Sequence, residues 1–328
     1  MKKRQSVSGR LRRSVYLLVF DRCQILDFAG PAQVFTCASQ FQRDAKARFG
    51  GYALKLISTK RTVVTESGIS VGCELLPENL EAPATLLIVG GPGVMAAAET
   101  ATLRDWYINA VKETERWGAI CTGSLALAAW GLLDGKRVTT HWDSLGRLSS
   151  YSRVRVENDA LFVRDGRLWT SAGISSGIDM ALAMVGRDAG TLVAAKTAQQ
   201  MVLASKRSGS QSQYSDLLSL QQRDADGVFA GLHAWLEENL SQPISLADMA
   251  EQCAMSTRSL QRHYKAVLGT SPSKTLNRLR LDRARTLLDS TEVPVSQVAN
   301  QCGYGSVQQF SKDFRKAFGV TPSSYRNR

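Results

Sequence analysis

The sequence predicts an α/β domain with a parallel sheet, followed by an all-α domain that contains two helix-turn-helix units. The first two hundred residues alternate short apolar runs with helical stretches, which is typical of a layered α/β sheet. Beyond residue 222, strand patterns disappear and helical periodicity continues to the end. The length of 328 residues also favours two domains, because it is about twice the common domain size.

Short apolar runs predict strands at residues 15–20, 54–58, 86–89, 119–121 and 138–140. The run SKRSGSQSQYSDLLSLQQ at 205–222 is rich in Ser and Gln, and it predicts a tether between domains. We therefore predict a basic arm at 1–13, an α/β domain at 14–205, a linker at 206–222 and a helical domain at 223–328.

Positive charge gathers in two parts of the chain, whose formal net charge is +12. Residues 1–13 carry six Lys and Arg and no acid, while residues 256–328 carry thirteen against four acids. The remainder is mildly acidic. This distribution favours a polyanion such as nucleic acid as the partner of the helical domain.

Several classes of protein are excluded by pattern. No apolar stretch approaches the eighteen or so residues that cross a bilayer, and the apolar run after the basic arm is too short for a secretory signal. The six cysteines show no CxxC or zinc-like spacing. We expect a cytoplasmic protein with no membrane association, no structural disulfide, no metal and no cofactor.

An internal repeat marks the helical domain. LQRHYKAVLGTSP from Leu260 matches FSKDFRKAFGVTP from Phe310 at an offset of fifty, and AEQCA from Ala250 matches ANQCG from Ala299 at an offset of forty-nine. Each copy is predicted to form a short helix, a tight turn and a longer helix. A helix at residues 275–289 is predicted to bridge the copies; it carries four Arg and has Leu276, Leu279, Leu287 and Leu288 available for packing.

The longer helix of each copy has a polar face suited to DNA. In the first copy, Leu260, Tyr264 and Leu268 form the buried stripe. Arg can bond guanine and Gln can bond adenine, whereas Lys suits phosphate. One such face alone would be interpreted as a solvated surface, but two copies could enter successive major grooves. The candidate DNA-binding residues are Arg258, Gln261, Arg262 and Lys265 in the first copy, and Gln308, Ser311, Lys312 and Arg315 in the second.

Residues 223–328 resemble the DNA-binding domain of the AraC/XylS family. The resemblance is carried by PISLADMAEQCAMSTRSLQRHYKAVLGTSP and by VSQVANQCGYGSVQQFSKDFRKAFGVTPSSYR. It implies that bases are read by Arg258, Gln261 and Arg262 in the first unit and by Gln308 and Lys312 in the second. Lys312 stands where the family more often has Arg, and Lys lacks bidentate geometry.

In the α/β domain, Cys121 lies between a predicted strand and a helical stretch, with Ala119 and Gly123 two residues away on either side. Small neighbours at these positions are typical of a nucleophile elbow, and a following helix lowers a thiol pKa. Cys23, Cys37 and Cys73 lack this setting and are interpreted as small buried hydrophobes.

Four further residues follow predicted strands and are expected at the same crevice. Asp27 could orient a ligand, Gly91 and Gly93 could donate backbone N–H groups, and His141 could act as a base. The structural alternatives are a helix cap for Asp27, a turn for the glycines and a packing role for His141.

This half resembles the class I glutamine amidotransferase-like, PfpI-type superfamily, in the version fused to AraC-type domains in GlxA-like regulators. The resemblance rests on LDFAGPAQVF, IVGGPG, ICTGSLALAAWGLLDGKRVTTHW and LWTSAGISSGIDMALAMV, with SGSQSQYS as a variant Gly-Gly-Gln tract. It implies a flavodoxin-like sheet, a homodimer and a ligand pocket around the elbow. The expected pocket residues are Asp27, Gly91, Gly93, Cys121, Thr122 and His141.

The sequence therefore predicts a transcriptional regulator of operator DNA that senses a small nitrogenous or amino-acid-like effector through a non-catalytic domain. Peptidase relatives have His after the nucleophile, but this position is Thr122, so the hydrolytic dyad is missing. The alternative is a bifunctional protein that hydrates or hydrolyses its ligand through Cys121, because isonitrile hydratases also combine an early Asp with Cys-Thr.

Overall fold

The computed structural model describes residues 12–42, 50–78, 82–203, 207, 209, 213, 224 and 226–326, without the side chains of 289 and 290. The chain divides into two compact units, Met1–Gln213 and Tyr214–Arg328. Nearly all of the predicted basic arm and most of the predicted linker lie outside the described residues. Three described residues of that linker, at 207, 209 and 213, belong to the first unit, which extends beyond the predicted end at residue 205.

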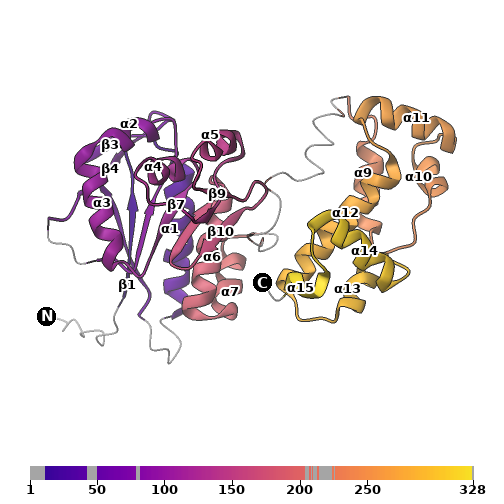
Figure 1. The fold of residues 1–328 in the computed structure, drawn as a ribbon. Helices are drawn as coiled ribbons and strands as arrows, with labels where there is room; N and C mark the ends of the chain where they lie inside the picture. Colours follow the sequence, from indigo (N-terminus) through magenta and orange to yellow (C-terminus); the bar gives the residue numbers. More distant parts are fainter. Residues whose placement is uncertain are drawn as a thin grey trace, which may run out of the picture. The chain divides into compact units, whose positions relative to one another are not determined.

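The first unit is built on a seven-stranded sheet in the order β10-β11-β7-β6-β1-β2-β5 (Figure 1). Its strands are β1 (Arg13–Leu18), β2 (Tyr52–Ser58), β5 (Glu74–Leu75), β6 (Thr85–Ile88), β7 (Arg116–Ile120), β10 (Phe162–Asp165) and β11 (Leu168–Ser171). All neighbours are parallel except β10 and β11. The five central strands follow the order 2-1-3-4-5, so the predicted flavodoxin-like sheet is confirmed.

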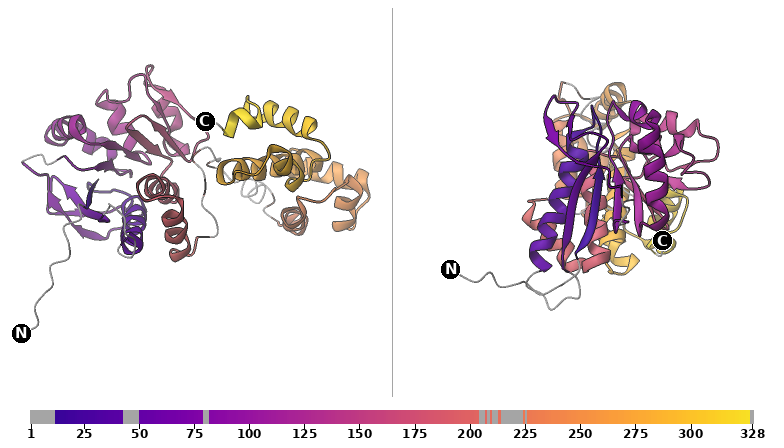
Figure 2. Two further views of the ribbon diagram at one scale, coloured as in Figure 1. Left: turned by 90° about the horizontal axis from the view of Figure 1, so that it is seen from below. Right: turned by 90° about the vertical axis from the view of Figure 1, so that its left-hand side faces the viewer.

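Helices cover both faces of the sheet, as a parallel sheet requires. On one face α1 (Ile25–Gln42), α6 (Ser176–Ala189) and α7 (Thr191–Gln200) pack together, and on the other α2 (Val94–Glu99), α3 (Ala101–Glu113) and α4 (Gly123–Ala129) do so (Figures 1 and 2). Strands β6 and β7 are buried along their whole length. The sheet therefore places its strand ends on a rigid core.

The predicted strand at 138–140 is wrong as a member of the main sheet. Only Arg137–Val138 is a strand, β8, which pairs with β9 (Arg155–Val156) in a separate ladder. Thr139 and Thr140 instead form side-chain hydrogen bonds, with Thr139 N–H donating to the Thr170 hydroxyl at 2.9 Å. Strand β7 is instead flanked by the predicted β6 on one side and by β11, which was not predicted, on the other.

The remaining elements of this unit are short. A hairpin of β3 (Thr62–Val64) and β4 (Ser70–Gly72) lies outside the main sheet, and a 3₁₀ turn η1 (Trp142–Ser144) leads into α5 (Leu145–Ser149). All six cysteines are free.

The second unit is helical throughout its described residues, and the views in Figures 1 and 2 show its helices. They are α9 (Ala230–Asn239), α10 (Leu246–Gln252), α11 (Thr257–Leu268), α12 (Pro272–Ser290), α13 (Val295–Gln301), α14 (Val307–Phe318) and α15 (Pro322–Arg326). None of the helices in the described part of the chain is both long and apolar enough to cross a membrane.

The predicted bridging role of the helix between the repeats is confirmed. Helix α12 contributes Leu276 and Leu279 to the hydrophobic core of the first helix-turn-helix unit, α10–α11. It contributes Leu281 and Leu288 to the separate core of the second unit, α13–α14. One continuous helix thus connects two small cores, which fixes the two helix-turn-helix units relative to each other.

Candidate functional site

Cys121 occupies a sharp turn between β7 and α4. Its φ angle is 57°, in the left-handed region that residues other than glycine rarely adopt, and its side chain is buried. The backbone of Gly173 approaches so closely that a Cβ there would lie 2.6 Å from the Cys121 sulfur. Small residues thus allow the predicted strand-to-helix elbow to form.

Asp27 lies in the first turn of α1 and is fully buried. Its carboxyl oxygens accept hydrogen bonds from the backbone N–H groups of Gly90, at 3.0 Å, and Ile174, at 2.7 Å. Burial raises the pKa of Asp27 to about 6, although both N–H donors favour its charged form. Asp27 therefore connects the Gly90 and Ile174 loops in this structure, in addition to its predicted place at the crevice as an acid that could orient a ligand.

The predicted donors at the glycine loop are engaged within the protein. Gly91 N–H donates to the Thr122 hydroxyl at 2.9 Å, and Gly93 N–H donates to the Arg22 carbonyl at 3.4 Å. Gly91 also has a φ of 135°, and a Cβ there would overlap the backbone of residues 22–24. These glycines are required for a tight turn, and their N–H groups are not free to bind a ligand in this structure.

The Cys121 thiol is held in its protonated form. Burial raises its pKa, and the adjacent Asp27 carboxyl raises it further, with the N–H and hydroxyl of Thr122 acting in the opposite direction. Only a thiolate is a strong nucleophile, so this environment opposes covalent catalysis at neutral pH. The effect on the pKa is opposite to the lowering predicted from the elbow pattern.

His141 follows β8, and its ring packs against Trp142 with 5.3 Å between ring centroids. Burial lowers the pKa of His141. Its neighbour Thr140 provides the direct link to the elbow, because the Thr140 hydroxyl donates to the Cys121 carbonyl at 3.0 Å. Thr140, Gly173 and Ile174 were not predicted as site residues, although Gly173 and Ile174 lie within LWTSAGISSG, part of a motif that carries the resemblance to the PfpI-type superfamily.

The first helix-turn-helix unit has well-formed caps. Ser245 and Asp248 form a capping box at α10, and the Ser256 hydroxyl accepts the Ser259 N–H at the start of α11. Leu260, Tyr264 and Leu268 are buried, as predicted. The opposite face of α11 exposes all four predicted DNA-binding side chains, Arg258, Gln261, Arg262 and Lys265.

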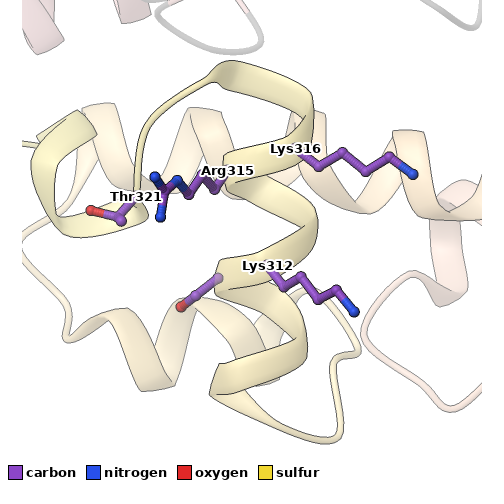
Figure 3. A pocket seen from close by; sticks show the side chains of 5 residues that line it. Lys312, Arg315, Lys316 and Thr321 are labelled. Carbon is purple, nitrogen blue, oxygen red and sulfur yellow. The ribbon is translucent and has the colours of Figure 1, made fainter.

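In the second helix-turn-helix unit, α14 repeats this arrangement with Phe310 and Phe314 buried. Gln308, Lys312 and Arg315 are exposed, and Ser311 is partly buried. A depression of about 580 Å³ is lined by Ser311, Lys312, Arg315, Lys316 and Thr321. Figure 3 shows Lys312 and Lys316 extending in the same direction from α14, with Arg315 directed toward Thr321.

Lys316 and Thr321 were not predicted for this surface. The repeat did not indicate Lys316, because the offset of fifty aligns it with Ala266, which carries no charge.

No three His, Cys, Asp or Glu side chains come together as a metal site within the described residues.

Comparison with known proteins identifies both units. Residues 13–187 match the DJ-1/PfpI family, and residues 249–328 match a helix-turn-helix domain. The chain is 29% identical over 322 residues to the transcriptional regulator GbdR of Pseudomonas aeruginosa, covering 97% of this chain and 85% of that regulator. It is 28% identical over 267 residues to the regulator GlxA of Rhizobium meliloti, covering 81% and 82%.

Among solved structures, a ThiJ/PfpI family protein from Pseudomonas syringae superposes with a TM-score of 0.53 at 22% identity. It covers 62% of this chain and 80% of its own, which supports the fold of the first unit. The chain therefore belongs to the DJ-1/PfpI family, as a member in which the DJ-1/PfpI domain is followed by a helix-turn-helix domain of the AraC type.

Proposed function

We propose that this chain is a sequence-specific transcriptional regulator that binds operator DNA through α11 and α14. The observation that carries the proposal is the pair of equivalent helices, each with a buried apolar stripe and an exposed polar face. Helices of this type read base edges in the major groove. The printed names of GbdR and GlxA, both transcriptional regulators, support the same assignment.

The two units differ in the chemistry they offer to DNA. Helix α11 presents Arg258, Gln261 and Arg262, which can form paired hydrogen bonds with base edges. Helix α14 presents Lys312, Arg315 and Lys316 around a depression with two hydroxyl groups, which suits phosphate oxygens. We therefore assign most of the base discrimination to the first helix-turn-helix unit and more of the contact with the DNA backbone to the second helix-turn-helix unit.

The DJ-1/PfpI domain is proposed to sense a small effector at the Cys121 elbow. The nearby apolar side chains Leu26, Trp142 and Ile174 are at least one-third exposed, so a ligand could bury them. Asp27 then acts by fixing the loops, and the effector is recognised by groups nearer the surface, among them Thr122 and His141. The effector class remains the predicted one, a nitrogenous or amino-acid-like metabolite.

A second activity through Cys121 is not supported by the geometry. The thiol is buried beside a carboxyl group, which keeps it protonated. The relatives that align along most of the chain are named as regulators.

We further propose a cytoplasmic homodimer, in which two chains present four recognition helices to a repeated site.

Selection of duplexes from a random-sequence pool by the full chain tests the proposal. We expect a shared motif to be enriched, and its affinity to fall as salt is raised. The double variant Gln261→Ala/Arg262→Ala should lose the motif, whereas the exposed control Arg153→Ala in the first unit should keep it. A full chain that enriches no motif and shows no salt-sensitive binding contradicts the proposal. Light scattering on the same sample tests the dimer.

A further inference from the structure

Arg207 is held on the first unit by a buried carboxylate. Its backbone N–H donates to Asp179 Oδ1 at 3.1 Å, and its Nε donates to Asp179 Oδ2 at 2.9 Å. Its Nη2 also donates to the Ser175 hydroxyl at 2.8 Å. The Asp179 side chain is 5% exposed, against 35% for Arg207, so the guanidinium is the accessible member of this pair.

Gln213 and Gly209 are held at two further places. The Gln213 amide nitrogen donates to the Thr139 hydroxyl at 3.1 Å and to the carbonyls of Thr140, at 3.0 Å, and Ala160, at 3.1 Å. The Gly209 carbonyl accepts the N–H of Phe162, the first residue of β10, at 3.2 Å. Arg207, Gly209 and Gln213, here called the anchor residues, thus bind the domain just before the chain enters the second unit.

Two of the three anchor residues are each connected to the elbow through one short segment. Residues 174–175 connect Arg207, and Thr140 connects Gln213. Ile174 N–H donates to Asp27, and the next residue, Ser175, accepts from Arg207. On the other side, the Thr140 hydroxyl donates to the Cys121 carbonyl, and the Thr140 carbonyl accepts from Gln213. A displacement of either elbow loop therefore changes the position of an anchor's partner.

We infer that the anchor residues form a latch that couples the Cys121 elbow to the segment leading into the DNA-binding unit. Movement of the 173–175 loop or of Thr140 weakens the anchors, and loss of the anchors in turn loosens the elbow loops, because coupling between two sites is reciprocal. Use of the latch by an effector rests on the proposed function. The coupling itself is a property of the first unit and can be measured without effector or DNA.

Hydrogen exchange on the full chain tests the latch. The variant Thr140→Val removes the hydroxyl that bonds the Cys121 carbonyl but keeps the shape of the side chain. The amides of Arg207 and Phe162 report on the two other anchors, because each N–H takes part in one and all three anchors lie within the seven residues 207–213, so loosening at Gln213 should reach them. We expect both to exchange about fivefold faster, as for the loss of one hydrogen bond from the closed state. Thr140→Ser should restore the slow exchange.

Thr114→Val is the matched control. The Thr114 hydroxyl is also buried and also donates to a carbonyl, that of Ala110 at 2.7 Å, but it lies at the opposite end of β7 from Cys121. This variant should leave the Arg207 and Phe162 amides unchanged. Equal acceleration in both variants would show general loosening of the domain and would overturn the latch.

The reverse direction uses the anchors as the perturbation. Gln213→Leu and Arg207→Ala should accelerate exchange at the amides of Cys121 and Ile174, which donate to Ser171 and Asp27. Unchanged exchange at these elbow amides would overturn the inference. Failure of DNA selection leaves this result unaffected, so the latch and the proposed function are tested separately.

Discussion

Ala254 and Gly303 occupy the same position in the turns of the two helix-turn-helix units, and both have a left-handed backbone. Their φ angles are 51° and 71°. The repeat AEQCA and ANQCG places them in register, so the shared conformation follows from the sequence repeat. Their surroundings differ. Ala254 is exposed, whereas a Cβ on Gly303 would lie 2.3 Å from the Leu240 carbonyl and 2.6 Å from Arg280 Nη2.

Gly303→Ala should therefore destabilise the DNA-binding unit by about 2 to 4 kcal/mol, since left-handed strain adds to overpacking against a backbone carbonyl. Arg280 fixes that carbonyl, because its Nε donates to Leu240 at 3.2 Å. Gly319→Ala is the control, since Gly319 is also left-handed but has open space around it. It should cost only about 1 kcal/mol. Hydrogen exchange of α12–α14 measures both, and equal effects would contradict the steric argument.

Much of this architecture could be predicted from the sequence because it depends on local patterns. The stripe of Leu260, Tyr264 and Leu268 indicated the face of α11 that is exposed, and the repeat extended the argument to α14. The alternation of apolar runs indicated the parallel sheet. The Cys121 turn followed from its small neighbours.

The environment of the elbow could not be predicted, because it depends on contacts between residues far apart in the chain. Burial raises the pKa of Asp27, and its carboxyl group accepts a hydrogen bond from Ile174, which lies 147 residues later in a loop that was not assigned to the site. Thr140 formed hydrogen bonds through its side chain where a strand was expected. Anchoring of Gln213 and Arg207 was hidden by a composition that resembles a free tether.

Asp27 should give the first unit a distinctive pH dependence. Its pKa is about 6 when folded, above the ordinary value of about 3.9 for the unfolded chain, so the folded state favours the protonated form. This contribution is complete below pH about 4 and is lost as pH rises through about 6. It amounts to about 3 kcal/mol.

The difference in unfolding free energy between wild type and Asp27→Asn isolates this effect. That difference should change between pH about 4 and 7 and stay flat above it, as followed by denaturation of the full chain with tryptophan fluorescence. Asp21→Asn is a control of opposite sign. Hydrogen bonds from Lys60 and Val64 lower the pKa of Asp21, so its contribution is lost as pH falls. A pH-independent difference for Asp27→Asn would show that Asp27 is not shifted.

A buried ion pair between Arg116 and Asp188 should contribute far more to stability than exposed ion pairs do. Arg116 is the first residue of β7, so it lies at the opposite end of this strand from Cys121. The Arg116 guanidinium donates to both carboxylate oxygens of Asp188, at 2.9 and 2.6 Å, and both side chains are less than one-tenth exposed. Arg116→Ala leaves the buried carboxylate without this partner and should cost about 3 to 5 kcal/mol. Arg153→Ala, which breaks an exposed pair with Asp134, should cost under about 1 kcal/mol. Similar melting shifts for both would contradict this ranking.

The final prediction separates base reading from phosphate contact on α11. Arg262 and Lys265 are neighbours on the same exposed face, but guanidinium can bond one base through two hydrogen bonds while ammonium acts as a point charge. With a selected duplex, Arg262→Ala should cost about 1 to 3 kcal/mol and relax preference at one or two base pairs. Lys265→Ala should weaken all sequences alike and reduce the slope of log affinity against log salt by about 1. Titrations of cognate and scrambled duplexes at several salt concentrations measure both effects. If Lys265→Ala instead alters sequence preference while Arg262→Ala changes only the salt slope, the two roles are reversed.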